Sequence, residues 1–513
     1  MSTTARKILW NTFAQIIGKA IIAILGVVII KLVTNYLGKA GYGEYTTSFD
    51  YLALFTIIAD MGLYTIGIRE MSKDNSKISK IMGNILTVRT FFSIIIICIA
   101  GFVAFFIPQY QNTHIPIAVW LAGGAAFFNL LTSTISAVLQ VHLKMEYNSL
   151  GSVVGKVINL LYIIFAIYIL HPANTDIGFY HLIAAGIIGN GAMFFVTLYY
   201  AKKYSPIRFH FDWIYVKEVL IKALPYGVAL VLNTIYFRIG SFSLSILRTP
   251  AEVGVYGVPM RMLEAVGIIP LYFMNAVLPV LTRAIARKDG SHQKIIHYAF
   301  DFLVMGSLPI VAGTFALSYP MIYLISSPEF LSRPADGFVG SDAVLPILIF
   351  ALAASFINSL FGFILVADNR QMKILTRNAI GAAMTVALDF TLVPIFGVRA
   401  AAFDNVITEC YVALASYFLA KHYLKFKIKF SNSLKALFAS VVMGATVIFL
   451  DTKLQPYIQN KSVFLLIPLG AIIYIGILFL TKAITPDMLA MIRKPKPIPA
   501  SDQKVIPHAD EVD

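Results

Sequence analysis

Apolar runs of about twenty residues recur along the whole chain, and they constrain its fold more than any other feature of the sequence. A run of this length crosses the hydrocarbon core of a bilayer as a helix, because the backbone in lipid must satisfy its own hydrogen bonds. Charged residues make up only 13% of the chain and hydrophobic residues 58%, so the polar surface of a soluble protein is missing. We therefore predict an all-α, polytopic membrane protein.

The sequence predicts about fourteen transmembrane helices. The run that follows the basic pair Arg6-Lys7 has no small-residue cleavage site, so it is expected to be the first of these helices rather than a signal peptide. The expected spans are residues 8–33, 46–68, 83–107, 116–140, 150–170, 179–201, 218–246, 254–281, 295–325, 343–367, 374–395, 400–420, 434–450 and 463–481.

The distribution of basic residues orients these helices. Most of the 41 Lys and Arg residues fall in the N-terminal segment, the even-numbered loops and the C-terminal tail. By the positive-inside rule, both termini are predicted to be cytoplasmic in a multi-pass protein of the cell membrane. The same distribution explains the net charge of +15 by contact with anionic membrane lipids, so we do not expect nucleic acid as a partner.

A weak internal repeat suggests how the helices are grouped. Gly43-x-Tyr45 and Gly254-x-Tyr256 each follow the first helix of a possible six-helix half. We predict two pseudo-symmetric lobes, a common transporter plan. The expected divisions are residues 1–210 for helices 1–6, 211–425 for helices 7–12, 426–482 for helices 13 and 14, and 483–513 for a disordered cytoplasmic tail.

Sequence motifs of enzymes and metal sites do not appear. Cys98 and Cys410 lie in apolar runs without a CxxC spacing, and the chain has no HExxH, GxSxG or phosphate-binding GxxxxGK[ST] pattern. We therefore predict no catalytic residues, no metal site, no cofactor and no enzymatic activity.

Two arginines are predicted to lie inside spans. Arg238 and Arg261 stand at similar distances from the loop that joins helices 7 and 8, and each costs roughly 2.5–3.5 kcal/mol at a helix centre. A protein-lined, water-filled cavity is the natural location for them. Glu264 lies one turn beyond Arg261 and is a possible ion-pair partner for it. Arg238 has no acidic residue within one turn, so a ligand-binding role is favoured for this side chain.

Other charged residues are also expected inside spans. Lys19 in helix 1 is predicted to join the two arginines in a cationic, substrate-binding cavity, to which Arg89 and Lys156 contribute from helices 3 and 5. Asp60 is expected either to pair with a cation of the cavity or to carry a proton. Lys31 is predicted to reach towards the outer interface.

Several separated stretches resemble the polysaccharide flippases of the multidrug/oligosaccharidyl-lipid/polysaccharide exporter superfamily. They are RIGSFSLSILRTPAEVGVYGVPMRMLEAVGIIP, LGKAGYGEYTTSF, ADMGLYTIGIREMSK, LQVHLKMEY and DFTLVPIFGVRAAAFDNVITE. Glu409 matches an acidic position that is common in the family, where a packing or a transport role is open. The chain departs from the family at Gly240, where an acidic residue is frequent, and at Asp389, where Asn is usual.

The resemblance implies a function in the biosynthesis of polysaccharides and cell-surface glycans. It implies a flippase that moves a polyprenyl-pyrophosphate-linked oligosaccharide across the membrane by alternating access of two lobes. Other membrane proteins of glycan assembly are possible partners. One alternative is a drug/cation antiporter of the same superfamily, although helix 1 offers Lys19 and no carboxylate. Another is a membrane polysaccharide polymerase or glycosyltransferase, although no long outer loop or aqueous domain is expected.

Overall fold

The structure, a computed structural model, describes residues 3–173, 175–287 and 290–484, and these residues form helices without any strand. The long helices are α1 (Thr3–Asp60), α2 (Leu63–Lys73), α3 (Ile78–Ala104), α4 (Ile115–Val141), α5 (Met145–Phe165), α6 (Asp176–Ala201), α7 (Trp213–Leu247), α8 (Pro250–Val266), α9 (Ile268–Arg287), α10 (Ser291–Ile325), α11 (Ser341–Ala367), α12 (Gln371–Phe396), α13 (Val398–Leu424), α14 (Ser431–Ile458) and α15 (Val463–Leu480).

The predicted all-α membrane fold is confirmed. Each predicted span overlaps a helix, with α1 containing the first span and most of the second, and α8 and α9 together forming the eighth. Eleven helical segments of the described chain are long and apolar enough to cross a membrane. Most of the predicted tail, residues 485–513, lies outside the described residues.

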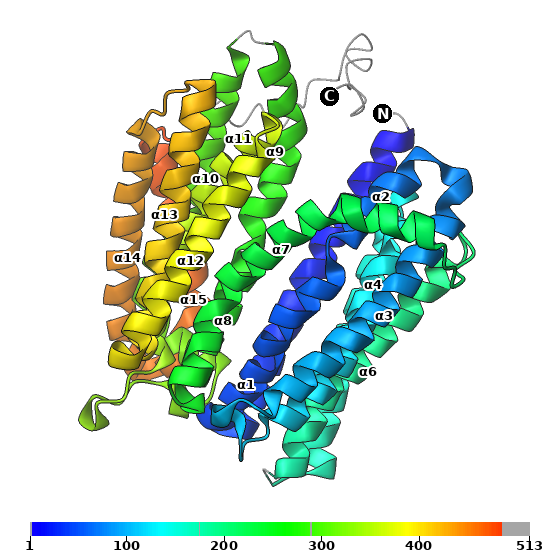
Figure 1. Cartoon of the computed structure of the whole chain (residues 1–513). Coiled ribbons are helices and arrows are strands. Elements are labelled where there is room, and N and C mark those ends of the chain that lie inside the picture. Colours follow the sequence, from blue (N-terminus) through cyan, green and yellow to red (C-terminus); the bar gives the residue numbers. More distant parts are fainter. Residues whose placement is uncertain (1–2, 174, 288–289, 485–513) are drawn as a thin grey trace.

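The helix α1 reverses direction at Gly38, so it contains two antiparallel arms. Gly38 has a φ of 65° and a ψ of −174°, a conformation that glycine adopts readily. In Figure 1, α2, which follows α1, lies at the same end of the molecule as the start of α1. The reversal therefore places the first two predicted spans side by side.

The helices gather in two groups. In Figure 1, α1–α6 lie on one side of the molecule and α10–α15 on the other. The helix α7 connects the groups: its N-cap residue Asp212 donates its backbone N–H to Asn84 of α3, and Ser243 near its other end bonds Asp389 of α12. The first turns of α7 thus pack with the N-terminal helices, although the predicted division at residue 211 assigns them to the second lobe. The lobe boundaries themselves stay a prediction.

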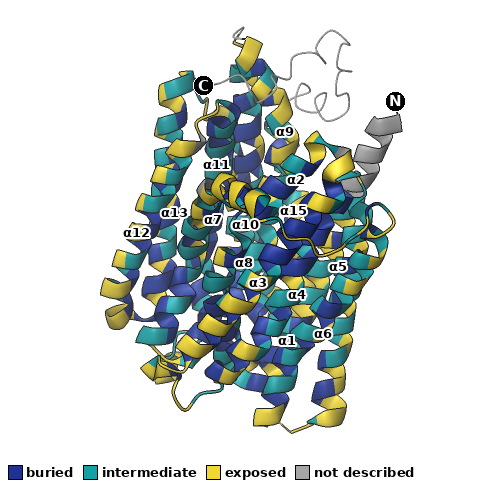
Figure 2. Ribbon diagram, turned by 45° about the vertical axis from the view of Figure 1, so that its right-hand side comes forward, coloured by how far each residue is buried: buried dark blue, intermediate teal, exposed yellow. Residues whose placement is uncertain are grey.

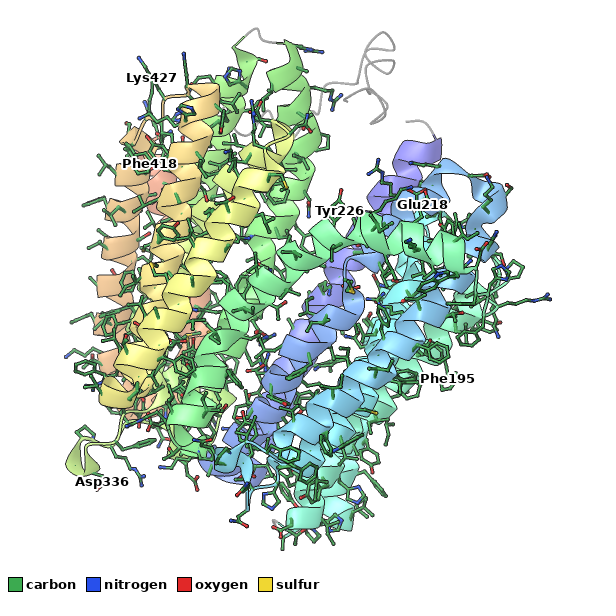
Figure 3. All side chains as sticks on the ribbon, in the orientation of Figure 1. Phe195, Glu218, Tyr226, Asp336, Phe418 and Lys427 are labelled. Carbon is green, nitrogen blue, oxygen red and sulfur yellow. The ribbon has the colours of Figure 1, made fainter. Side chains whose placement is uncertain are left out.

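Many large apolar side chains are exposed, among them Phe464 at 73% and Ile472 at 68% on α15. Figure 2 shows that exposed positions recur along the lengths of the helices and not only at their ends. Exposed apolar surface on this scale is expected of helices in contact with lipid. Asp336 and Lys427, which the sequence places in an outer and a cytoplasmic loop, lie at opposite ends of the molecule in Figure 3.

Two glycines form a reciprocal contact where the second arm of α1 crosses α8. A Cβ atom added to Gly43 would lie 1.7 Å from the carbonyl oxygen of Pro250, and one added to Gly254 would lie 2.2 Å from the carbonyl oxygen of Lys39. Lys39 and Pro250 are separated along the chain by the same number of residues as Gly43 and Gly254. The helices α1 and α8 therefore contact each other through equivalent glycines and equivalent carbonyl groups, so the weak sequence repeat corresponds to a symmetric contact.

The first arm of α1 also caps a helix of the second group. Lys31 donates from Nζ to the carbonyl oxygens of Tyr323 and Ser326, at 2.9 and 2.6 Å, at the C-terminal end of α10. A cation there bonds carbonyl groups that lack partners within the helix and meets the negative end of its dipole. Lys31 thus bonds protein carbonyl groups at the end of α10 that leads into a predicted outer loop, and its reach towards the outer membrane interface stays a prediction.

Replacing Gly43 by alanine is predicted to destabilise the protein by about 2 kcal/mol or more, because the methyl group can be accommodated only if α1 and α8 move apart. Thermal unfolding of the purified protein in detergent checks this. Gly476→Ala in α15 is the matched control, since an added Cβ there meets nothing within 4 Å. Equal unfolding temperatures for the two variants would contradict the close crossing.

Beside this crossing, His114 joins two carboxylates from different helices. Its Nδ1 lies 2.7 Å from Oε2 of Glu44 in α1, and its Nε2 lies 3.1 Å from Oδ1 of Asp176 in α6. Burial alone lowers the pKa of His114, but the hydrogen bonds and negative charges of Glu44 and Asp176 outweigh it and raise the pKa above its usual value. When protonated, the imidazole therefore acts as a clamp between α1, α4 and α6.

The clamp predicts a pH dependence of stability. Because the pKa of His114 is higher in the folded protein, its contribution is complete below about pH 6.5, the usual value, and is lost as the pH rises through the raised value. The unfolding temperature of the wild type is therefore expected to fall over this range by more than that of His114→Gln. Identical pH profiles of the two proteins would show that the clamp does not contribute.

Candidate functional site

Four charged side chains meet between α1, α7 and α8, and we call them the charge quartet: Asp50, Arg238, Arg261 and Glu264. Nη1 of Arg238 bonds Oδ1 of Asp50 at 2.9 Å and Oε1 of Glu264 at 2.7 Å. Arg261 bonds the same Oδ1 through Nη2 at 2.8 Å, and Oε2 of Glu264 through Nη1 at 2.9 Å. The quartet is a closed ring in which each cation bonds both anions.

The four members are not equally buried. The side chain of Asp50 is 4% exposed, whereas Arg238, Arg261 and Glu264 are 24%, 26% and 36% exposed. Asp50 therefore lies on the inner side of the ring and Glu264 on the accessible side. Both arginines belong to segments long and apolar enough to span a membrane, and the water-filled cavity predicted around them stays a prediction.

Small residues on two helix faces bring the quartet together. On α1, Gly43 and Thr46 precede Asp50 at helical spacing, and on α8, Gly254 and Gly257 precede Arg261 in the same way. The glycines cross within contact, and a Cβ on Gly257 would lie 3.2 Å from Cγ2 of Thr46. One further turn along both faces brings Asp50 against Arg261. The sequence repeat thus continues into the charge pair, with opposite charges at equivalent positions.

Asp50 is the member that sequence reasoning missed. Arg238 lacks an acidic neighbour on its own helix, as the sequence indicated, but its two partners come from α1 and α8. The pairing of Arg261 with Glu264 was the alternative left open for that arginine, and the structure shows it. A signal for Asp50 was present, since it is an acidic residue inside the second predicted span and lies at helical spacing from Gly43.

The predicted lysines lie outside the ring. Lys156 on α5 is partly buried and near enough to Arg261 for their charges to repel, and no described residue forms an ion pair with it. Lys19, on the first arm of α1, is exposed and bonds none of the quartet. Of the two, Lys156 is therefore the better placed to add positive charge beside the arginines.

Arg89 and Asp60 form a separate ion pair between α3 and α1. Arg89 is 1% exposed and also donates from Nη1 to the hydroxyl of Thr134 on α4, at 2.7 Å. Its burial and its pairing with Asp60 give it a packing role within the N-terminal helices in this structure. The structure therefore does not bring Arg89 into the arginine site.

Glu409 lies in α13, in a polar cluster with Tyr236 of α7 and Arg377 of α12. It is 4% exposed, and its Oε2 has no hydrogen-bond partner among the described residues. Arg377, which is 6% exposed, donates from Nη1 to Oδ1 of Asn358 at 3.0 Å and also bonds Ser416. This cluster joins α7, α11, α12 and α13 and is distinct from the quartet.

A pair of buried acids lies at the contact of α12 and α13. Asp389 and Asp404 are both fully buried, and Oδ2 of Asp389 accepts a hydrogen bond from Ser243 at 3.1 Å, whereas both carboxylate oxygens of Asp404 have no hydrogen-bond partner among the described residues. No group of three metal-ligating side chains occurs among the described residues.

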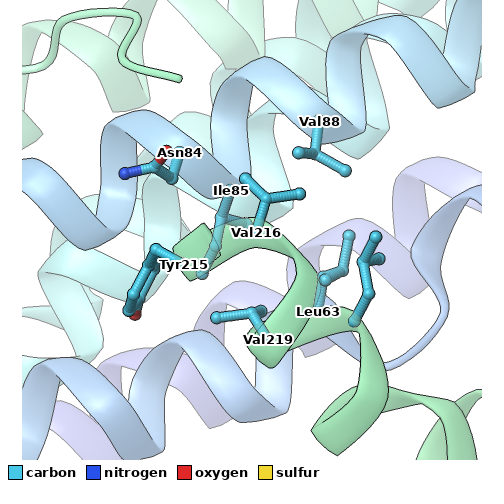
Figure 4. Close-up of a pocket in the computed structure, with 8 residues that line it drawn as sticks. Leu63, Asn84, Ile85, Val88, Tyr215, Val216 and Val219 are labelled. Atoms are coloured by element: carbon cyan, nitrogen blue, oxygen red, sulfur yellow. The ribbon is translucent and has the colours of Figure 1, made fainter. Parts of the chain in front are cut away.

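A small, mostly apolar pocket lies away from the quartet, between α2, α3 and α7 (Figure 4). It contains no charged side chain, so it lacks the cationic groups that the arginine site offers to an anion. Its lining residues are Leu63, Asn84, Ile85, Val88, Tyr215, Val216, Val219 and Leu220.

Comparison with known sequences gives one family. The model of a family described as polysaccharide biosynthesis protein matches residues 8–285, which include the whole quartet. No curated protein matches the chain.

Comparison with solved structures gives the fold. The lipid II flippase MurJ, in an inward closed conformation, is 13% identical and superposes with a TM-score of 0.71, over 91% of this chain and 98% of that one. An inward-facing multidrug resistance MATE family transporter of the MOP superfamily is 16% identical, with a TM-score of 0.61 over 81% and 98% of the two chains. A MOP superfamily transporter from Pyrococcus furiosus, described as having a binding pocket of reverse polarity, is 16% identical with a TM-score of 0.57, over 82% and 95%.

The unequal burial of the quartet predicts unequal effects of neutralising its acids. Asp50→Asn is expected to lower stability by about 2 kcal/mol, because it leaves two arginines facing each other at the inner side of the ring. Glu264→Gln is expected to cost about 1 kcal/mol or less, because its more exposed carboxylate is partly screened by water. Thermal unfolding of both variants in detergent measures the difference, and a larger effect for Glu264→Gln would contradict the arrangement.

Proposed function

We propose, on the premise that the chain belongs to the family of polysaccharide biosynthesis proteins, that it moves a polyprenyl-pyrophosphate-linked oligosaccharide across the cell membrane. The fold is that of flippases and transporters of the MOP superfamily. The substrate class and the alternating-access cycle are the parts that belong to the proposal.

One observation carries the proposal: two adjacent, partly exposed arginines on neighbouring helices within membrane-spanning segments. A guanidinium group bonds two phosphate oxygens at once through its planar donors and stays charged in a poorly hydrated site. Lys156 adds a further positive charge beside Arg261. This chemistry suits an anionic head group that must leave water to cross a bilayer.

The contacts between the helix groups support alternating access. The arm of α1 that carries Asp50 bonds α7 and α8 through the quartet, while Lys31 on the other arm caps α10. To open where α1 meets α8 and α10, the protein has to separate these polar contacts, for which water can substitute. It also has to separate the helices at the crossing of Gly43 and Gly254. When the two groups of helices rock about the arginines, these polar contacts break, and water lowers the free-energy cost by bonding the released groups.

Transport of a cationic drug fits the site less well. The first arm of α1 has no acidic residue from Ile8 to Leu37, and both carboxylates of the quartet are already bonded to arginines. A cationic drug that entered the site would be repelled by Arg238, Arg261 and Lys156. We therefore propose transport of an anionic lipid, and translocation rather than formation of a glycosidic bond.

The proposal predicts that Arg238→Ala combined with Arg261→Ala reduces translocation at least about a hundredfold, since two charge-assisted contacts of the head group are lost. The measurement is uptake of a defined polyprenyl-pyrophosphate-linked oligosaccharide in proteoliposomes that contain the purified protein. The orientation of the protein in the proteoliposome membrane is measured in parallel by thiol labelling of the variant Asp336→Cys.

Arg333→Ala is the matched control for the loss of an arginine, because Arg333 is 54% exposed in the loop between α10 and α11. It should transport like the wild type. Unchanged transport by the double variant, with normal insertion, would refute the role of the arginines. Formation of longer glycans by the detergent-solubilised wild type would refute the assignment to transport.

A further inference from the structure

We propose that Glu264 occupies the place of an anionic head group in the quartet, and that Asp50 and Glu264 together make the site select a doubly charged pyrophosphate over a singly charged phosphodiester. The inference rests on the proposed function and adds to it the rule by which the site tells its lipid substrate from the surrounding phospholipids.

The geometry of Glu264 is that of a bound phosphate edge. Its two oxygens each accept one hydrogen bond, Oε1 from Arg238 at 2.7 Å and Oε2 from Arg261 at 2.9 Å. Two oxygens of one phosphate group can accept from the same pair of Nη1 donors. Glu264 is also the most exposed member of the quartet, at 36%, so a ligand reaches it first.

Asp50 has the opposite character. A single oxygen, Oδ1, accepts from both arginines, and the side chain is 4% exposed. It is therefore placed to stay bonded when Glu264 is displaced. In that position Asp50 holds the two guanidinium groups together and cancels one of their two charges.

Donors remain for a second phosphate. Nε and Nη2 of Arg238 bond no side chain or carbonyl in the described part of the chain, although the arginine is only 24% exposed. The ammonium group of Lys156 is a further donor, close enough to Arg261 for the two charges to interact. A pyrophosphate can replace Glu264 with one phosphate and bond these remaining groups with the other.

The charge balance then sets the selectivity. The quartet has two positive and two negative members, so it is formally neutral. A phosphodiester has the same single negative charge as the Glu264 carboxylate that it displaces, so the displacement gains no attraction. The displaced carboxylate stays close and repels the phosphodiester. A pyrophosphate diester carries one charge on each phosphate, so its second charge gains attraction that the exchange alone does not supply. Specificity here comes from a built-in repulsive group as well as from attraction.

The experiment compares two probes that differ by one phosphate. The purified wild-type protein is placed in nanodiscs of phosphatidylcholine, and the affinities of a polyprenyl-pyrophosphate-linked and a polyprenyl-phosphate-linked N-acetylglucosamine are measured by competition. The wild type is expected to prefer the pyrophosphate by about tenfold or more, and Glu264→Gln is expected to reduce this preference about tenfold by strengthening binding of the phosphodiester. Asp50→Asn should act in the same direction.

Glu252→Gln is the matched control, because Glu252 also lies on α8 and bonds an arginine at the end of α7, Arg248, but outside the quartet. It should keep the wild-type preference. Equal preference in the wild type, Glu264→Gln and Glu252→Gln would overturn the inference. A wild type that binds neither probe would overturn the proposed function as well, whereas one that binds both equally overturns only the selectivity.

If Glu264→Gln does not fold, the wild type alone still decides. Phosphatidylglycerol, added to the nanodiscs in place of part of the phosphatidylcholine, brings a singly charged phosphodiester in large excess. Binding of the pyrophosphate probe should be almost unchanged, because the quartet discriminates against single charges. Strong competition by phosphatidylglycerol would overturn the inference.

Discussion

The free-energy cost of placing charged side chains inside a bilayer determines how the helices of this protein are arranged. Each arginine of the quartet would cost several kcal/mol in lipid, and it is tolerated because two carboxylates from other turns of the chain meet it. Those bonds require α1, α7 and α8 to lie together, since Asp50 belongs to the first and the arginines to the other two. The ion ring and the helix arrangement therefore depend on each other, and the rest of the helices pack around that junction.

The polar contacts of the interior divide into two kinds. Arg89, which pairs with Asp60, and Arg377, which bonds Asn358 and Ser416, are deeply buried and bond partners within one group of helices, where they stabilise packing. The quartet joins α1 to α7 and α8, and Lys31 joins α1 to α10; both arginines of the quartet and Lys31 are partly exposed. Contacts of the second kind can exchange protein partners for water or a ligand, which makes them suited to a moving interface.

The sequence was enough to predict the membrane fold, because hydrophobic length and the absence of charge are properties of single segments. The spans and both arginines follow from it directly. Partners across helices do not, because a single sequence does not reveal which face of one helix meets which face of another. Asp50 was overlooked for that reason, and Arg89 was assigned to a cavity although Asp60 holds it elsewhere. Only the Gly43 and Gly254 repeat contained inter-helix information, and its extension by helical spacing leads to Asp50 and Arg261.

In the proposed alternating-access cycle the two groups of helices separate, and the hydrogen bonds from Lys31 to the end of α10 then break. The ammonium group of Lys31 and the two carbonyl oxygens that it bonds are all strongly hydrated in water. Separating them therefore exposes polar groups to water rather than apolar side chains. In the proposed transport cycle, water can therefore take over both hydrogen bonds of Lys31 when α1 and α10 separate. The same polar groups that hold the two helices together then line the solvated space between them.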